Sequence, residues 1–214
     1  MLKKFFIIFI IFFNYSLPVF AEKVVVFEFT EGEMKKLKVR KIKKQTRYTL
    51  GSNDNGRYLK AEAEGKASGL GTEKKINLLK TPFINITWKI EKDLFGIDER
   101  SKKGHDYAAR VFVVKKTGLT ALSNKAINYV FSSNNAVGKF WRSPYTKKSI
   151  DYVLATTLNQ KNEWVTVKAN VKEDFKKLHN LDVSEIEGIA IMTDTDNSKK
   201  LAIAYYQNIY FSSE

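Results

Sequence analysis

The sequence of 214 residues contains no cysteine. This absence excludes disulfide bonds, cysteine ligands for a metal, and lipid attachment to a cysteine behind a leader peptide. Histidine is scarce as well, and two histidines leave almost no material for a zinc site built on imidazoles. The fold must therefore be held together by the burial of side chains alone.

Several catalytic motifs are missing too. The chain has no G-x-S-x-G segment that would place a nucleophilic serine, and no glycine loop of the kind that binds phosphate. A histidine base would have to be His105 or His179. The chemistry that is left is carboxylate chemistry with Asp106, Asp194 and Asp196, as in glycoside hydrolysis.

Proline is rare, with three residues, and we find no internal repeat or low-complexity linker. Nothing therefore marks a domain boundary after residue 22. We expect a single domain at 22–214. It contains 193 of the 214 residues, which is enough to form one core.

Residues 1–21 have the pattern of a secretory signal peptide. Lys3 and Lys4 precede an apolar run at residues 5–13, and a cleavage site with small residues ends at Ala21. We expect cleavage after Ala21 and export, to the periplasm or the medium. No later segment is apolar for long enough to span a membrane, so we expect no membrane span in the mature chain.

The chain is strongly basic. Its net charge of +14 falls to +12 when the signal peptide is removed, because that segment holds two lysines and no acid. An exported protein meets anionic envelope polymers and lipid headgroups rather than nucleic acid, so we expect no nucleic-acid partner. A generic solvated lysine surface is the simpler alternative, and residues 35–47 are its densest part.

Apolar and polar side chains alternate along most of the chain, which is the period of β-strands. Residues 84–90 are an example, with Ile84, Ile86 and Trp88 separated by polar residues. Further strands are predicted at 24–29, 57–64, 107–115, 126–131, 149–156, 163–169, 187–192 and 202–211, and weaker ones at 46–50 and 70–76. One short helix is predicted near 172–179. About ten short strands favour an all-β fold, a β-sandwich or jelly roll.

An arginine stands within the predicted central strand at 107–115. Arg110 shares a face with Asp106, but four residues of strand span about 13 Å, so the two cannot pair directly. A charged side chain in a largely apolar strand needs a partner. Asp194 or Asp196 would serve in a structural ion pair. In the alternative interpretation, Arg110 lies on the floor of a concave sheet and binds a sugar hydroxyl or a carboxylate.

Acidic residues follow the predicted strand at 187–192. The segment 194–197, Asp-Thr-Asp-Asn, resembles the opening of a calcium loop. An EF-hand would need Gly and Glu where the chain has Lys199 and Tyr205, so that motif is excluded. The simplest interpretation is a connection between two antiparallel strands. A different calcium site on Asp194 and Asp196 is the weaker alternative, and we expect no other metal or cofactor.

Aromatic residues gather in the second half of the chain, and aromatic faces stack on sugar rings. Trp141 and Tyr145 fall in a loop-like segment and are therefore the better candidates for ligand contact. Tyr206 is a further candidate. Tyr129 and Tyr205 are expected to fill strands, as their β-propensity favours.

Several segments together carry a resemblance to a known family. They are His105-Asp106-Tyr107-Ala108-Ala109-Arg110, Asn128-Tyr129-Val130-Phe131, Ser143-Pro144-Tyr145-Thr146, Trp164, Met192-Thr193-Asp194-Thr195-Asp196-Asn197, and 205–211. In these segments the chain resembles an exported bacterial family catalogued as domain of unknown function 3047. The resemblance covers most of the mature chain in order. It implies a galactose-binding-like jelly roll without an established reaction. His105 stands where the family has an acid beside Asp106, which weakens a two-carboxylate mechanism.

Three functions are compatible with these observations. The leading hypothesis is an exported β-sandwich module that binds a glycan or an anionic envelope polymer. Its candidate ligand-binding or ion-pair residues are Asp106, Arg110, Asp194, Asp196, His105, Trp141, Tyr145 and Tyr206. The alternatives are a glycan-active hydrolase or lyase that uses carboxylates and Arg110, and an envelope scaffold without a small ligand.

Overall fold

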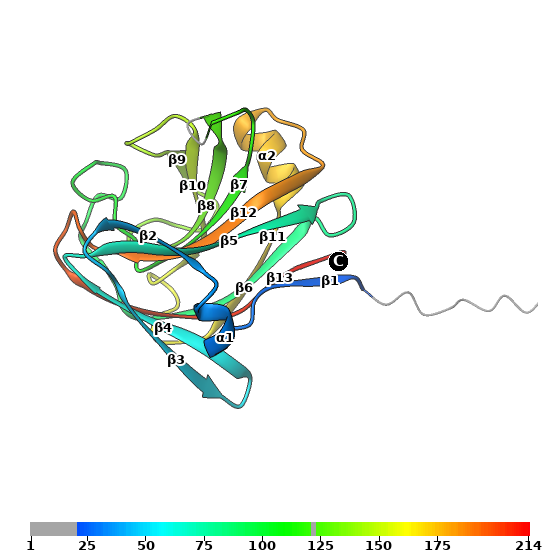
Figure 1. Cartoon of the computed structure of the whole chain (residues 1–214). Coiled ribbons are helices and arrows are strands. Elements are labelled where there is room, and N and C mark those ends of the chain that lie inside the picture. Colours follow the sequence, from blue (N-terminus) through cyan, green and yellow to red (C-terminus); the bar gives the residue numbers. More distant parts are fainter. Residues whose placement is uncertain (1–20, 121–122) are drawn as a thin grey trace, which may run out of the picture.

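The structure, a computed structural model, describes residues 21–120 and 123–214. These residues form two β-sheets packed face to face, as Figure 1 shows. The predicted all-β sandwich of the jelly-roll class is thereby confirmed. The predicted signal peptide, residues 1–21, lies outside the described residues except for Ala21.

The first sheet has six strands, all paired antiparallel. Their order is β11 (Val165–Asn170), β6 (Phe83–Lys92), β13 (Leu201–Ser212), β4 (Gly56–Glu64) and β3 (Arg47–Asn53), and β1 (Lys23–Phe27) also pairs with β13. One edge of β13 is occupied by β6. The other edge is shared, because β4 pairs with its first half and β1 with its last residues.

The second sheet has seven strands. Their order is β2 (Lys38–Lys43), β5 (Ala67–Asn77), β12 (Glu185–Asp194), β7 (Ala109–Lys115), β8 (Lys125–Ser132), β10 (Ser149–Thr156) and β9 (Phe140–Arg142). β8 and β10 run parallel, and the other neighbours run antiparallel.

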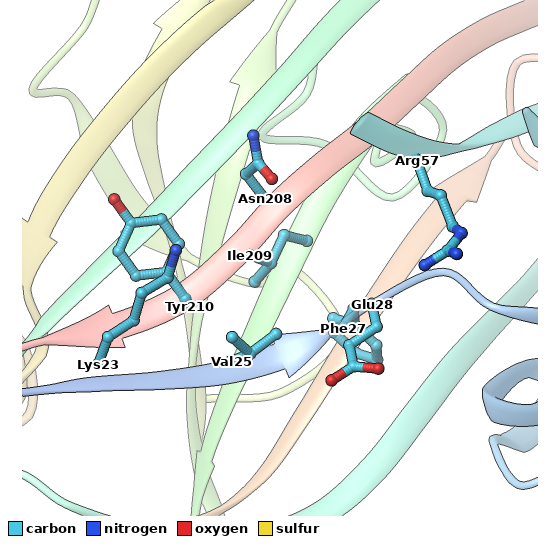
Figure 2. Close-up of a pocket in the computed structure, with 8 residues that line it drawn as sticks. All are labelled: Lys23, Val25, Phe27, Glu28, Arg57, Asn208, Ile209 and Tyr210. Atoms are coloured by element: carbon cyan, nitrogen blue, oxygen red, sulfur yellow. The ribbon is translucent and has the colours of Figure 1, made fainter. Parts of the chain in front are cut away.

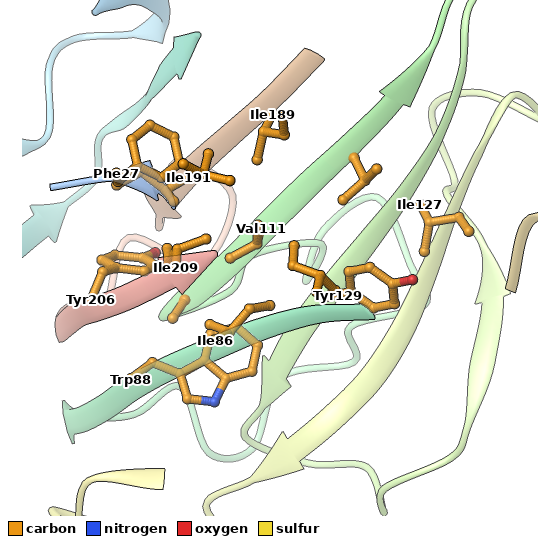
Figure 3. Packing of buried hydrophobic residues seen from close by; sticks show 14 of the residues in the cluster. Phe27, Ile86, Trp88, Val111, Ile127, Tyr129, Ile189, Ile191, Tyr206 and Ile209 are labelled. Atoms are coloured by element: carbon orange, nitrogen blue, oxygen red, sulfur yellow. The ribbon is translucent and has the colours of Figure 1, made fainter. Parts of the chain in front are cut away.

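Strand alternation sends every second side chain into the space between the sheets. On β6, Ile84, Ile86, Trp88 and Ile90 are all fully buried. Trp88 meets Phe131 of β8 across the interface, with ring centroids 5.5 Å apart. Figure 3 shows aliphatic and aromatic side chains from both sheets packed together in this layer. The core predicted from the period of two is therefore the layer that joins the sheets.

Helix α2 (Val171–His179) matches the predicted helix near 172–179. The side chain of Asn170 caps its first turn by accepting a hydrogen bond from Glu173 N at 3.1 Å. Asn180 ends it in the left-handed conformation, which asparagine tolerates. A second helix, α1 (Glu31–Met34), is one turn long and was not predicted. Among the described residues, neither the length nor the apolarity of any helix suffices to cross a bilayer.

Three expectations about local structure need correction. The strand predicted from residue 107 begins at Ala109, because Tyr107 bonds with Asp194 outside the strand ladder. The connection after Asp194 leads from one sheet to the other, and does not join two paired neighbours. The edge strand β2 was missed because its sequence, KVRKIK, has no regular apolar alternation.

Replacement of Trp88 by Ala should remove the largest fully buried side chain among the described residues, together with its contact to Phe131. We expect the Trp88→Ala variant to lose about 3–5 kcal/mol of unfolding free energy, measured by urea denaturation. Leu79→Ala is the control, because Leu79 is 67% exposed. Its change should stay within about 0.5 kcal/mol. Equal losses in the two variants would contradict the assignment of Trp88 to the core.

Candidate functional site

The predicted arginine and one of its predicted partners meet at the second sheet. Arg110 lies on β7 opposite Met192 of β12, and Asp194 is the last residue of β12. The guanidinium Nη2 of Arg110 donates to Oδ2 of Asp194 in an ion pair. Arg110 is 5% exposed and Asp194 1% exposed. Both charges are therefore buried, and each lowers the cost of burying the other.

Aromatic and sulfur groups enclose the guanidinium. Its central carbon lies 5.2 Å from the ring centroids of Tyr107 and Phe112, and Nη2 lies 3.6 Å from the sulfur of Met192. These contacts are favourable for a cation that has lost its water. The Nε atom of Arg110 is buried without a hydrogen-bond partner among the described residues.

Tyr206 supports the same region from the other sheet. Its ring is fully buried, so the structure places it in the interior. Its hydroxyl donates to the carbonyl of Met192 at 2.7 Å and accepts from the backbone N–H of Arg110 at 3.3 Å. It also lies 2.9 Å from the hydroxyl of Thr193. Tyr206 thus links β13 of the first sheet to β7 and β12 of the second.

Asp106 holds the connection that follows β12. Its carboxylate accepts from the backbone N–H of Asn197 at 3.2 Å, from Nδ2 of Asn197 at 2.9 Å and from the backbone N–H of Ser198 at 2.6 Å. The backbone N–H of Asp194 donates to the carbonyl of Tyr107 at 3.1 Å. The segment before β7 and the segment after β12 are therefore fastened to each other.

Burial decides the electrostatics of this cluster. It raises the pKa of Asp194 to about 8, and the carboxylates of Asp106 and Asp196 act in the same direction, while Arg110 opposes them. Burial acts to lower the pKa of Arg110, but the surrounding carboxylates, Asp194 foremost, raise it above its usual value. The arginine accordingly stays charged.

Three carboxylates of the described chain could hold a cation. Asp106, Asp194 and Asp196 each offer one oxygen, and these oxygens lie within 4.8 Å of one another. Arg110 already supplies a positive charge to Asp194, and N–H groups already occupy Asp106. The surroundings therefore favour neutralisation by the protein's own donors over a calcium ion.

His105 is buried in a separate polar group. Its Nε2 lies 2.8 Å from Oδ2 of Asp151 on β10, and Nδ2 of Asn128 donates to the other carboxylate oxygen at 2.7 Å. The His105 ring packs edge-on against Tyr107 and Tyr145, with centroids 5.3 and 5.5 Å away. Asp151, the partner of His105, was not among the predicted site residues.

The two predicted contact aromatics differ in exposure. Trp141 lies on β9 and is half-buried against Tyr107, Val130 and Val153. Tyr145 is 56% exposed, and its hydroxyl lies 2.8 Å from Oδ1 of Asn197. Trp141 thus covers part of the second sheet, whereas Tyr145 keeps a surface that a ligand can reach.

A group of aromatic residues that the sequence reasoning missed lies on the outer face of the first sheet. We call it the aromatic platform, and it consists of Tyr58 on β4, Tyr205 on β13 and Trp164 just before β11. The three ring centroids are 5.5 to 6.0 Å apart. The ammonium of Lys89 lies 4.3 Å from the Tyr205 ring and 5.5 Å from the Trp164 ring.

The alternation of side chains along a strand could have revealed part of the aromatic platform. Tyr205 and Tyr206 are neighbours on β13 and must point to opposite sides of the sheet, so only one of them can enter the core. Tyr206 was assigned to ligand contact, but its ring is fully buried. Tyr205 fills its strand as predicted, is 9% exposed, and packs on the opposite face against Tyr58. The pairing of β13 with β4 and β6, which completes the platform, leaves no signal in a single sequence.

Two surface hollows are lined by residues outside these groups. One, of about 200 Å³, opens where β1 takes over from β4 beside β13 (Figure 2), and it is lined by Lys23, Val25, Phe27, Glu28, Arg57, Asn208, Ile209 and Tyr210. The other, of about 360 Å³, is lined by Phe29, Thr30, Glu31, Leu50, Gly51, Ser52 and Arg57. None of the predicted site residues lines either hollow.

With this geometry in view, the chain can be compared with known proteins. The family model described as "Protein of unknown function (DUF3047)" matches residues 33–210. The chain belongs to this family. The resemblance inferred from the sequence segments is thereby confirmed. No curated protein sequence matches the chain.

Solved structures with a similar arrangement of strands include carbohydrate-active proteins. One is the family 30 carbohydrate-binding module of a cellulosomal cellulase of Clostridium thermocellum, with 8% identity, 90% of this chain and 94% of that chain covered, and a TM-score of 0.49. Another is the xyloglucanase domain of NopAA from Sinorhizobium fredii, with 11% identity, coverage of 81% and 92%, and a TM-score of 0.42. Likenesses of this size carry no argument about a ligand or a reaction.

The raised pKa of Asp194 predicts a pH dependence of stability. Burial raises the pKa of this carboxyl from 3.8 to about 8, so keeping Asp194 ionised beside Arg110 costs unfolding free energy across this pH range. The contribution of Asp194 to the unfolding free energy should therefore fall as the pH rises between these values. Urea denaturation from about pH 4 to about pH 8 should show that Asp194→Asn removes this decline. A stability advantage of the wild type over Asp194→Asn that increases with pH would contradict the raised pKa.

Proposed function

We propose that this protein is an exported binding module whose ligand is a glycan or a glycan-containing polymer of the cell envelope. The observation that carries the proposal is the aromatic platform on the outer face of the first sheet. Export is proposed from the signal-peptide pattern, and N-terminal sequencing of the exported protein should then begin at Glu22.

The platform combines the two kinds of contact that a sugar ring needs. The C–H face of a sugar packs on aromatic rings, and its hydroxyls need donors and acceptors at the rim. Tyr58 and Trp164 are half-buried, so each keeps part of its ring accessible. The Tyr205 hydroxyl donates to Oε2 of Glu91 at 2.5 Å, and the ammonium of Lys89 stands over the rings.

The neighbouring strand is shaped to fit the platform. Gly51 on β3 stands opposite Tyr58 on β4, and a Cβ atom at Gly51 would lie 2.5 Å from the Tyr58 ring. The absence of a side chain there lets the Tyr58 ring lie down over β3. The position of the ring is thus set by two strands, and the platform is fixed before a ligand arrives.

The charged network around Arg110 has a different role in this proposal. Asp106 and Asp194 are 0% and 1% exposed, and their oxygens already accept hydrogen bonds from the chain. A glycan-active enzyme would need carboxylates that reach a substrate. We therefore propose that Asp106, Arg110 and Asp194 hold the loops together. Tyr145 is the most exposed of the site residues predicted from the sequence.

The proposal is tested by screening the exported, processed protein on a glycan array and measuring the strongest binder by calorimetry. We expect Trp164→Ala and Tyr58→Ala each to weaken binding roughly tenfold, which is about 1.4 kcal/mol. Gly51→Ala should weaken it as well, because it displaces the Tyr58 ring without removing it. Tyr145→Ala is the matched control and should bind as the wild type does.

Two outcomes would overturn the proposal. Loss of binding in Tyr145→Ala, with the platform variants unaffected, would move the site to the second sheet. No binding to any glycan or envelope polymer would favour the scaffold without a small ligand.

A further inference from the structure

A concentration of exposed positive charge lies at the edge of the second sheet. Strand β2 is the first in the order of that sheet, and all six of its residues are exposed. Figure 1 shows it beside β5. Lysines on an edge strand commonly protect a protein against aggregation. Three further observations indicate that this edge also recognises a ligand.

A β-bulge aligns the cations of β2. Arg40 pairs with Gly69 of β5 and Lys43 pairs with Ala67, and the register shifts at Ile42 between them. Because the bulge adds one residue, Lys43 lies on the same face of the sheet as Arg40. Without the bulge the two side chains would point to opposite faces.

Two lysines at this place have a backbone conformation that L-residues rarely adopt. Lys44, just after β2, has φ +57°, and Lys199, in the connection between β12 and β13, has φ +62°. Asparagine and glycine tolerate such angles better than lysine does. Backbone strain of this kind is found preferentially where a side chain has a task to perform.

The strained connection lies beside the end of β2, because Lys43 and Asp194 flank Ala67 of β5 as its two register partners. The N–H of Thr195 donates to the carbonyl of Lys66, and the N–H of Lys199 donates to the carbonyl of Thr195. The proximity of Lys43 lowers the pKa of Lys199, and Asp196 and Asp106 act in the opposite direction. Asp106 is already occupied by three N–H donors. Among the described residues, Arg40, Lys43, Lys44 and Lys199 form no ion pair with a carboxylate, while Lys38 pairs with Glu73. Folding thus brings these four positive charges together, and the single remaining carboxylate, that of Asp196, does not neutralise them.

We propose that Arg40, Lys43, Lys44 and Lys199, which we call the basic edge, bind a linear polymer that carries an anionic group on each repeating unit. The six residues of β2 extend over about 20 Å, which exceeds the reach of a single small anion. The exposed edge of β2 also offers backbone N–H groups along this length. The basic edge is on the second sheet, so the inference does not depend on the aromatic platform of the first.

The experiment uses the exported, processed protein, with sodium polyphosphate, sodium polygalacturonate and orthophosphate as probes. Affinity is measured by calorimetry between about 50 and about 200 mM salt. We expect polyphosphate to bind more tightly than orthophosphate. Lys43→Ala and Lys199→Gly should each weaken its binding roughly two- to fivefold and lower the salt slope by roughly one.

The glycine variant separates binding from folding. Lys199→Gly removes the backbone strain and the contact with Lys43, so its melting temperature should rise while its affinity for polyphosphate falls. Asn180→Gly changes another left-handed residue without changing the charge, and Lys80→Ala removes an exposed charge elsewhere. Both controls should bind polyphosphate as the wild type does.

The outcomes separate the alternatives. Binding of polygalacturonate as well as polyphosphate would support recognition of repeated charge, and binding of polyphosphate alone would support recognition of phosphate. Unchanged binding in Lys43→Ala and Lys199→Gly, an equal loss in Lys80→Ala, or orthophosphate binding as tightly as the polymer would overturn the proposal. None of these failures would affect glycan binding by the aromatic platform.

Discussion

The ion pair of Arg110 and Asp194 is the constraint on which the second sheet depends. A buried guanidinium without a partner costs several kcal/mol, so the end of β12 must stay beside β7. Asp106 adds to this by fastening the connection after β12, and Tyr206 ties both strands to the first sheet. The buried charge of Arg110 in an apolar strand therefore determines how the loops and the two sheets are joined.

This arrangement separates the two outer faces of the sandwich. On the second sheet the polar groups near Arg110 satisfy one another, and Trp141 covers part of them. On the first sheet Tyr58 and Trp164 keep partly exposed rings, which pack in tilted and edge-to-face contacts against Tyr205, itself 9% exposed. The outer face of the second sheet, which carries the charged motifs, is thus the more closed of the two. The outer face of the first sheet, which carries the aromatic platform, offers the better surface for a ring-shaped ligand.

Much of the fold could be predicted because alternation is a local signal. The strand with Ile84, Ile86 and Trp88 and the helix after Asn170 both follow from neighbouring residues. The need of Arg110 for an acid was also predictable, since burial of a charge has a known cost. Register between distant strands was not, because one sequence does not show which strands pair. For this reason Tyr206 was assigned to ligand contact although its ring is fully buried, and the grouping of Tyr205 with Tyr58 and Trp164 was missed.

The central claim is that the glycan ligand meets the first sheet, while the Arg110 network holds the loops of the second sheet together. Chemical-shift mapping of isotope-labelled protein with its strongest glycan ligand tests this claim directly. We predict the largest shifts at the Trp164 indole N–H and at the backbone amides of Tyr58 and Tyr205. Shifts concentrated at residues 105–110 and 194–197 instead would contradict it.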